Sequence, residues 1–136
     1  MIIGDPPPAA GGDHDCDGMS DILWRNSSTG ENWLYQVDGT GIDSSVRINT
    51  VVPTTWQIVG NGDYDGDGDA DILWRNSVSD QNWMYLMNGS LVESSMVVVW
   101  DSVFTIPTLW SVAGNGDYGG DGKSDILWRN SSTGEN

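Results

Sequence analysis

Residues 63–76 read Asp-Tyr-Asp-Gly-Asp-Gly-Asp-Ala-Asp-Ile-Leu-Trp-Arg-Asn, an acidic loop that runs directly into an apolar segment. The last six of these residues recur without change, at residues 21–26, 71–76 and 125–130. The copies are 50 and then 54 residues apart, and residues 20–32 are identical to residues 124–136. Self-similarity at a nearly fixed period is the sequence signature of a repeat architecture. The chain therefore contains two full repeats and a truncated third.

A period of about 50 residues is the size of one blade of a β-propeller. In the second repeat, alternating or β-branched segments separated by Gly, Asp and Asn-Gly turns indicate four strands, at residues 56–60, 71–76, 82–87 and 96–100. Helical spacing of apolar residues is interrupted by Gly or Asp in every candidate stretch. The sequence predicts an all-β fold built from blades of four antiparallel strands.

The repeats divide the 136 residues into about two and a half blades, with approximate bounds 1–52, 53–106 and a truncated 107–136. The first strand of blade one would cover residues 6–12, where three prolines restrict a strand to an edge position. A closed propeller usually has about 4 to 8 blades. We therefore expect closure by a homo-oligomer, in which two chains give about five blades and three give about seven, and the count slightly favours the dimer.

Composition excludes several classes of partner. Five Lys and Arg against 20 Asp and Glu give a formal net charge of -15, which opposes binding to nucleic acid or to an anionic membrane surface. The sequence contains no run of 18 apolar residues, so we expect no membrane insertion. A single cysteine excludes an internal disulfide, and the first 12 residues show no signal-peptide pattern.

Each repeat carries an acidic loop before its Ile-Leu-Trp segment, at residues 13–21, 63–71 and 117–125, here called loops one, two and three. Twelve of the 20 acidic residues lie in these loops. Carboxylates at alternate positions repel one another, and Ca²⁺, which takes 6 to 8 oxygen ligands, is the natural compensating cation. An EF-hand would need Glu at position 12, where Trp24 and Trp74 stand. A metal-free Asp/Gly turn is the alternative interpretation.

The pattern Asp-x-Asp-x-Asp-Gly-x-x-Asp followed by an Ile-Leu-Trp strand resembles the FG-GAP/VCBS repeats, which form the blades of integrin-α-like β-propellers. The resemblance implies that the loop joins the first two strands of a blade, that it binds Ca²⁺, and that the protein is extracellular or at the cell surface. It implies side-chain ligands in loop two at Asp63, Asp65, Asp67 and Asp71, with the carbonyl of Asp69. The corresponding set in loop one is Asp13, Asp15, Asp17 and Asp21, with the carbonyl of Met19. In loop three it is Asp117, Asp121 and Asp125, with the carbonyl of Lys123.

Two departures from the pattern matter. Cys16 replaces the glycine found at Gly66 and Gly120, and Gly119 replaces the second carboxylate of loop three. Two calcium sites and a weaker third are therefore expected. We also expect the thiol of Cys16 to have a raised pKa in its acidic setting, and His14 to be an exposed loop residue.

No nucleophile–base pair is visible, so a non-enzymatic, calcium-binding module for binding or assembly is expected. One alternative is a lectin that binds glycans through the recurring tryptophans and asparagines; the tryptophans would otherwise form the core between blades. A second alternative is a fragment of a larger secreted protein or enzyme. The recurring arginines, at positions 25, 75 and 129, either pair with loop carboxylates or reach a ligand, and a structural ion pair is the role we expect. A glycan or protein ligand is the expected partner besides a second copy of the chain.

Overall fold

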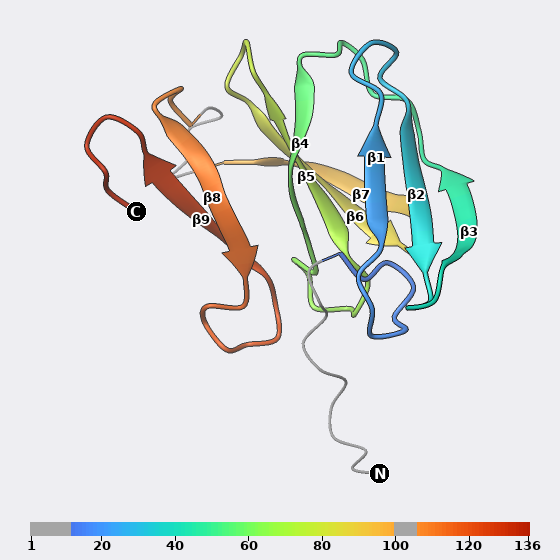
Figure 1. Cartoon of the computed structure of the whole chain (residues 1–136). Coiled ribbons are helices and arrows are strands. Elements are labelled where there is room, and N and C mark those ends of the chain that lie inside the picture. The colour runs from blue at the N-terminus through green and yellow to red at the C-terminus, as the bar shows by residue number, and fades with distance from the viewer. Residues whose placement is uncertain (1–11, 100–105) are drawn as a thin grey trace.

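The computed structural model of the chain describes residues 12–99 and 106–136, and these residues form nine strands without a helix (Figure 1). The strands are β1 Ile22–Arg25, β2 Asn32–Val37, β3 Ile42–Arg47, β4 Trp56–Gly62, β5 Asp71–Asn76, β6 Asn82–Asn88, β7 Leu91–Val98, β8 Trp110–Gly116 and β9 Asp125–Asn130. They pair antiparallel in three sheets, of order β1-β2-β3, β4-β5-β6-β7 and β8-β9. The predicted all-β class is confirmed, and the open sheets are partial propeller blades, called blades one, two and three below.

The middle sheet has the four strands that the sequence predicts for one blade. The fourth strand differs, because the apolar run predicts it at residues 96–100 whereas it begins at Leu91. The reason is the two-residue turn at Gly89 and Ser90, which places Asn88 opposite Leu91 in the ladder. Gly89 has φ +59°, a conformation that suits glycine. Trp100 and most of the strand predicted at residues 6–12 lie outside the described residues.

The register of the first two sheets places Trp opposite Trp on neighbouring strands. Trp24 pairs with Trp33, and Trp74 pairs with Trp83. Because side chains alternate along a strand, the Trp and the Arg that follow one another in the repeated hexapeptide lie on opposite faces of their sheet. Each blade therefore offers an aromatic face on one side and an arginine-bearing face on the other.

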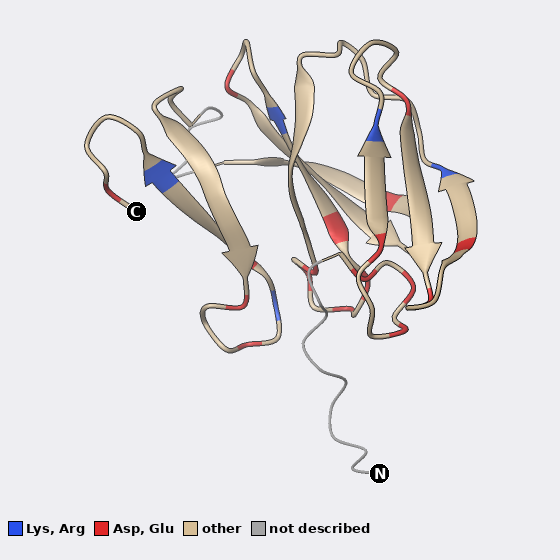
Figure 2. Ribbon diagram, viewed as in Figure 1, with Lys and Arg blue, Asp and Glu red and all other residues tan. Residues whose placement is uncertain are grey.

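The best-defined core lies between blades one and two. Leu34 and Ile48 of blade one pack there with Ile72, Trp74 and Met87 of blade two, and all five are buried. Burying apolar side chains of this size contributes about 1.5–3 kcal/mol each. This core fixes the first two blades side by side, and it holds their acidic loops at the same end of the sheets (Figure 2).

Candidate metal centre

The acidic loops occupy the connections that the resemblance implies. Loop two joins β4 to β5, loop three joins β8 to β9, and loop one leads into β1. Figure 2 shows acidic residues concentrated in these loops at one end of the sheets. The loops of the first two blades each bring three carboxylates together, and loop three does not.

Loop two places oxygen atoms of Asp63, Asp65 and Asp71 within 4.8 Å of one another. Asp71 is fixed by two backbone amides, because the Tyr64 amide donates to its Oδ2 at 2.8 Å and the Met87 amide to its Oδ1 at 2.8 Å. This carboxylate therefore ties the start of the loop to β6 as well as facing the other two acids. The two hydrogen bonds hold the Asp71 carboxylate in place independently of an ion.

The two carboxylate oxygens of Asp63 are held from within loop two. Oδ1 accepts a hydrogen bond from the Gly66 amide at 2.7 Å, and Oδ2 accepts one from the Gly68 amide at 3.0 Å. Both glycines have positive φ, +85° and +105°, which turns their amides inward. The Gly-x-Gly spacing is thus the local reason that the loop curls around its first acid.

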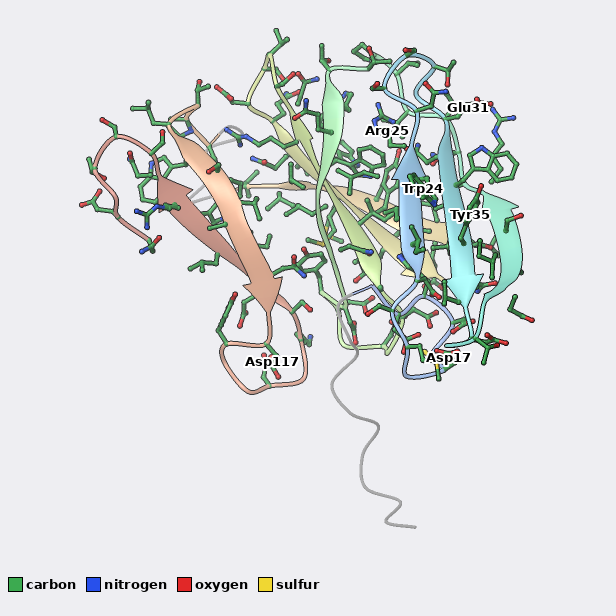
Figure 3. The ribbon with its side chains drawn as sticks, viewed as in Figure 1. Asp17, Trp24, Arg25, Glu31, Tyr35 and Asp117 are labelled. Atoms are coloured by element: carbon green, nitrogen blue, oxygen red, sulfur yellow. The ribbon has the colours of Figure 1, made fainter. Side chains whose placement is uncertain are left out.

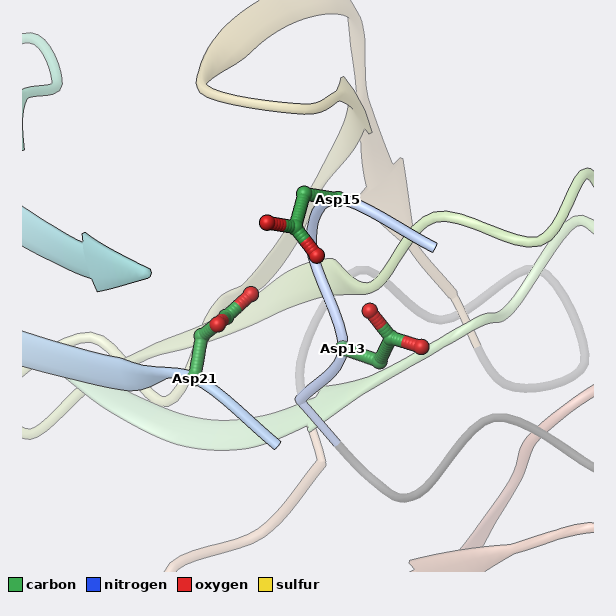
Figure 4. Close-up of side chains that lie close together, drawn as sticks. All are labelled: Asp13, Asp15 and Asp21. Atoms are coloured by element: carbon green, nitrogen blue, oxygen red, sulfur yellow. The ribbon is translucent and has the colours of Figure 1, made fainter. Parts of the chain in front are cut away.

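Loop one forms the equivalent group from Asp13, Asp15 and Asp21, again within 4.8 Å (Figure 4). Asp21 accepts from the amides of His14 at 2.7 Å and Val37 at 3.0 Å, which repeats the arrangement at Asp71. Asp13 Oδ2 accepts from the Gly18 amide at 2.9 Å. A hydrogen bond from β2 in blade one and from the equivalent β6 in blade two therefore holds the last acid of each loop.

The other oxygen of Asp13 has no partner. Asp13 Oδ1 is buried without a hydrogen bond, whereas the corresponding oxygen of Asp63 receives the Gly66 amide. Cys16 stands in place of that glycine and has φ +61°. A buried carboxylate oxygen without a donor carries a substantial desolvation cost, and a cation held by the three acids would remove it. The donor set of loop one therefore fits a metal ion.

Loop three is more open. Asp117 Oδ1 accepts from the amides of Gly120 and Asp121, and Asp125 Oδ2 accepts from the amides of Tyr118 and Gly119. These acids are exposed, and no third carboxylate joins them where Gly119 stands. The hydrogen bond from the Gly122 amide to Asp117, together with those from Asp121 and Gly120, lowers the pKa of Asp117. Backbone amides already stabilise its charge.

The remaining residues of the predicted ligand sets lie outside the two groups of three. Asp17, Asp67 and Asp121 are exposed, and each accepts a hydrogen bond from the amide two residues later. The side chain of Lys123 packs over Gly66. Met19 is 42% exposed. The part that Met19, Asp69 and Lys123 play through their carbonyls stays a prediction.

Burial disfavours the ionised form of Asp71, the last acid of loop two. The pKa of Asp71 is raised to about 6, chiefly by burial, although the amides of Met87 and Tyr64 oppose the shift. Burial also raises the pKa of Asp15 and of Asp67. Crowded carboxylates whose charge is disfavoured are stabilised by a divalent cation, because its charge reverses the local balance.

The side chain of His14 is buried, and the expectation of an exposed loop residue is wrong. It is 0% exposed, and its Nε2 donates to Asn61 Oδ1 of blade two at 2.9 Å. Burial lowers its pKa. The equivalent Tyr118 in blade three is 62% exposed. The difference arises because blade two covers loop one, and only the three-dimensional arrangement reveals this neighbour.

The acidic loops also contact one another. The Ala70 amide donates to the Asp13 carbonyl at 2.7 Å, and the Ser124 amide donates to the Asp63 carbonyl at 2.5 Å. The Cys16 thiol donates to Asp69 Oδ1 at 2.7 Å. This hydrogen bond raises the pKa of Cys16 to about 12, in the direction predicted. Each loop therefore lies against the next, a contact that the motif of a single loop does not encode.

The arginines do not pair with the acidic loops in blades one and two. Arg25 donates to the Val51 carbonyl at 3.0 Å. Arg75 donates to the Ile106 carbonyl at 2.7 Å and to Asp80, in the turn after β5, at 3.1 Å. The expected structural ion pair is thus found at Arg75, with Asp80, whereas neither Arg25 nor Arg75 pairs with a carboxylate of the acidic loops. Their guanidinium groups instead hold the connection that leads to the next blade.

Repeated antiparallel blades with acidic loops between their strands define a β-propeller-type repeat protein. Residues 13–74 and residues 63–128 each match the sequence profile of the FG-GAP-like repeat. The chain therefore belongs to the FG-GAP-like repeat family. Neither a curated protein nor a solved structure matches the chain significantly.

The described residues contain no helix that is long and apolar enough to cross a membrane.

Proposed function

We propose that the chain is a calcium-binding, non-enzymatic β-propeller module, with one ion held by Asp13, Asp15 and Asp21 and another by Asp63, Asp65 and Asp71. The unpartnered, buried Asp13 Oδ1 is the observation that carries this proposal. Carboxylate oxygens in a flexible loop are the ligands that Ca²⁺ prefers. Membership of the FG-GAP-like repeat family supports the same ion.

Calcium in this role stabilises the blades. Asp21 and Asp71 connect their loops to the amides of Val37 and Met87, so an ion at either loop also secures the following part of the sheet. An ion that binds only the folded chain adds about 2.7 kcal/mol at one hundred times its Kd. Millimolar calcium is characteristic of the extracellular setting in which weak sites of this kind operate. We propose that setting for the chain.

The test is calorimetric titration of the dialysed chain with CaCl₂, together with its melting curve in calcium and in chelator. We expect heat of binding and a higher Tm in calcium, reversed by the chelator. Asp15→Asn should weaken binding, because it removes one charge of the first group while it keeps an acceptor oxygen.

Asp43→Asn is the matched control, because Asp43 is an exposed acid of β3 outside the loops. It should bind calcium as the unmodified chain does. Identical melting curves in calcium and in chelator would reject the proposal, as would an equal loss of binding in Asp15→Asn and Asp43→Asn.

The tryptophan of the hexapeptide, at positions 24, 74 and 128, gives little support to the lectin alternative. Trp74 is 1% exposed and belongs to the core, and Trp128 lies beneath the guanidinium of Arg75. Of the three equivalent residues, Trp24 alone is more than half exposed. A row of repeated stacking platforms is therefore not formed by this position.

A further inference from the structure

The two junctions between successive blades share one construction. The leading face of a blade, defined as the face that carries the Leu and Arg of the hexapeptide, meets the trailing face of the next blade, which carries the Ile and Trp. At the first junction the guanidinium of Arg25 lies 5.0 Å from the ring centroid of Trp74. At the second, Arg75 lies 5.5 Å from that of Trp128. Each junction thus places an arginine of one blade over a tryptophan of the next, a cation–π contact.

Blade one presents a trailing face that no other described part of the chain covers. Trp24 is 54% exposed and Ile22 is 43% exposed, whereas the equivalent Trp74 and Ile72 of blade two are 1% and 0% exposed. A hollow of about 340 Å³ beside Trp24 is lined also by Trp33 and Tyr35. Trp24 and Tyr35 lie on the neighbouring strands β1 and β2 (Figure 3). In blade two the equivalent hollow, beside Trp74, Trp83 and Tyr85, is lined also by residues 50–52 of the connection from blade one.

Blade three presents the complementary leading face. Leu127 is 37% exposed, against 0% for the equivalent Leu73, and Arg129 is exposed. Arg129 Nη1 donates to Asn136 Oδ1 at 3.2 Å, which repeats the bond from Arg25 Nη1 to Asn32 Oδ1. The guanidinium is thus oriented by the same local contact that orients Arg25 toward the next blade.

We infer that the leading face of blade three binds the trailing face of blade one in a second copy of this chain, with Arg129 over Trp24 of that copy. The choice of a second copy rests on identity: residues 124–136 of the leading side repeat residues 20–32, which already dock onto blade two inside the chain. The two faces are therefore the separate halves of a junction that the chain forms twice within itself.

This contact is heterologous, because different surfaces of the two copies meet. Repetition of a heterologous contact gives a ring where the rotation closes and an open filament where it does not. The strongly acidic chains repel one another at low ionic strength, so added NaCl should strengthen the association by screening that repulsion. This salt response is opposite to that of an interface held by ion pairs.

The experiment is sedimentation of the whole 136-residue chain from low to high micromolar concentration, and it does not require calcium. We expect a mass above the 14.7 kDa of one chain. Trp24→Ala and Arg129→Glu should each raise the dissociation constant about tenfold or more. Leu91→Ala is the control, because Leu91 is 70% exposed in blade two, which contributes to neither of the terminal faces. It should assemble as the unmodified chain does.

A mixture of the two variants sharpens the test. The Trp24→Ala chain keeps an intact leading face and the Arg129→Glu chain an intact trailing face, so together they should form a dimer that neither forms alone. Should circular dichroism show that Trp24→Ala is unfolded, Arg129→Ala on the exposed side of β9 takes its place as the variant that must weaken assembly. A monomeric unmodified chain, folded variants that assemble normally, or a mixture that stays monomeric would each overturn the inference.

Discussion

β5 and β9 have the same six residues, yet they lie in different environments. In β5 the Ile, Leu and Trp side chains are 0–1% exposed, because blade one covers one face and blade three covers the other. In β9 the Leu is 37% exposed, and the Trp is only partly buried against blade two. The acids that precede the two strands differ in the same way, since loop two gathers three carboxylates and loop three does not. Identical sequence thus acquires different stability from its neighbours.

The largest expected difference is in the free energy of unfolding lost by Leu73→Ala in β5 and by Leu127→Ala in β9. Removing a fully buried leucine side chain leaves a cavity and costs about 2–5 kcal/mol, whereas the half-exposed equivalent should cost about 1 kcal/mol. Urea denaturation of both variants, diluted until each sediments as a monomer, measures the two losses. Equal losses of unfolding free energy would show that Leu73 in the middle blade is packed no more tightly than Leu127 in the third. If Leu73→Ala does not fold, the milder pair Ile72→Val and Ile126→Val, at equivalent positions of β5 and β9, compares the same two strands.

The next largest expected difference is in calcium binding by loop two and loop three. Asp65→Asn removes a charge from the group in loop two, and it should weaken calcium binding by about tenfold, or about 1.4 kcal/mol. Asp121→Asn makes the same chemical change in loop three and should leave the calcium-dependent rise in Tm almost unchanged. Calorimetry and melting curves of the two variants check this. A larger effect of Asp121→Asn would reverse the ranking of the sites.

Loop three can be made more like loop two by Gly119→Asp. A Cβ at Gly119 would lie 3.6 Å from Asp125 Oδ2, an ordinary contact, and Gly119 does not have a positive φ. The new carboxylate should therefore be accommodated and should add calcium binding at this loop. The gain should be modest, because the loop lacks a covering blade. An unchanged stoichiometry and affinity in calorimetry would contradict this expectation.

The smallest effect is the pH dependence of the calcium-free chain. Burial raises the pKa of Asp71 to about 6, above its unfolded value of 3.8. The folded state therefore binds the proton more tightly, and the free energy of unfolding should rise as the pH falls through 6 toward 4. Asp71→Asn should remove this contribution. Melting curves at several pH values after removal of calcium by dialysis test it, and a fall in Tm over this interval that disappears in the variant would refute it.

The repeats make much of the fold predictable. The hexapeptide, the Asn-Gly turn and the period of the repeats together indicate a four-stranded antiparallel blade from the sequence alone. The apolar run at residues 96–100 places the fourth strand too late, because the tight turn at Gly89 and Ser90 sets the start of that strand at Leu91. Local patterns thus indicate where a strand exists more accurately than they place the residues at which it begins and ends.

The environment of single residues is less predictable. His14 occupies the slot of Tyr118, and nothing in the sequence distinguishes a loop that the next blade covers from one that it does not. The same reason explains the arginines, whose carbonyl partners lie 26 and 31 residues further along the chain. Such contacts depend on how blades pack, and no local pattern encodes them.

The hydrogen bond from the Ala70 amide to the Asp13 carbonyl has a thermodynamic consequence. Asp13 belongs to one group of acids, and Ala70 directly precedes Asp71 of the other. Any free energy of interaction that passes between the two groups through this bond acts reciprocally, so each occupied loop changes the affinity of its neighbour by the same factor. If the proposed ions bind, successive loops joined in this way should bind them as a linked series, and the slope of the saturation curve measures the strength of the link.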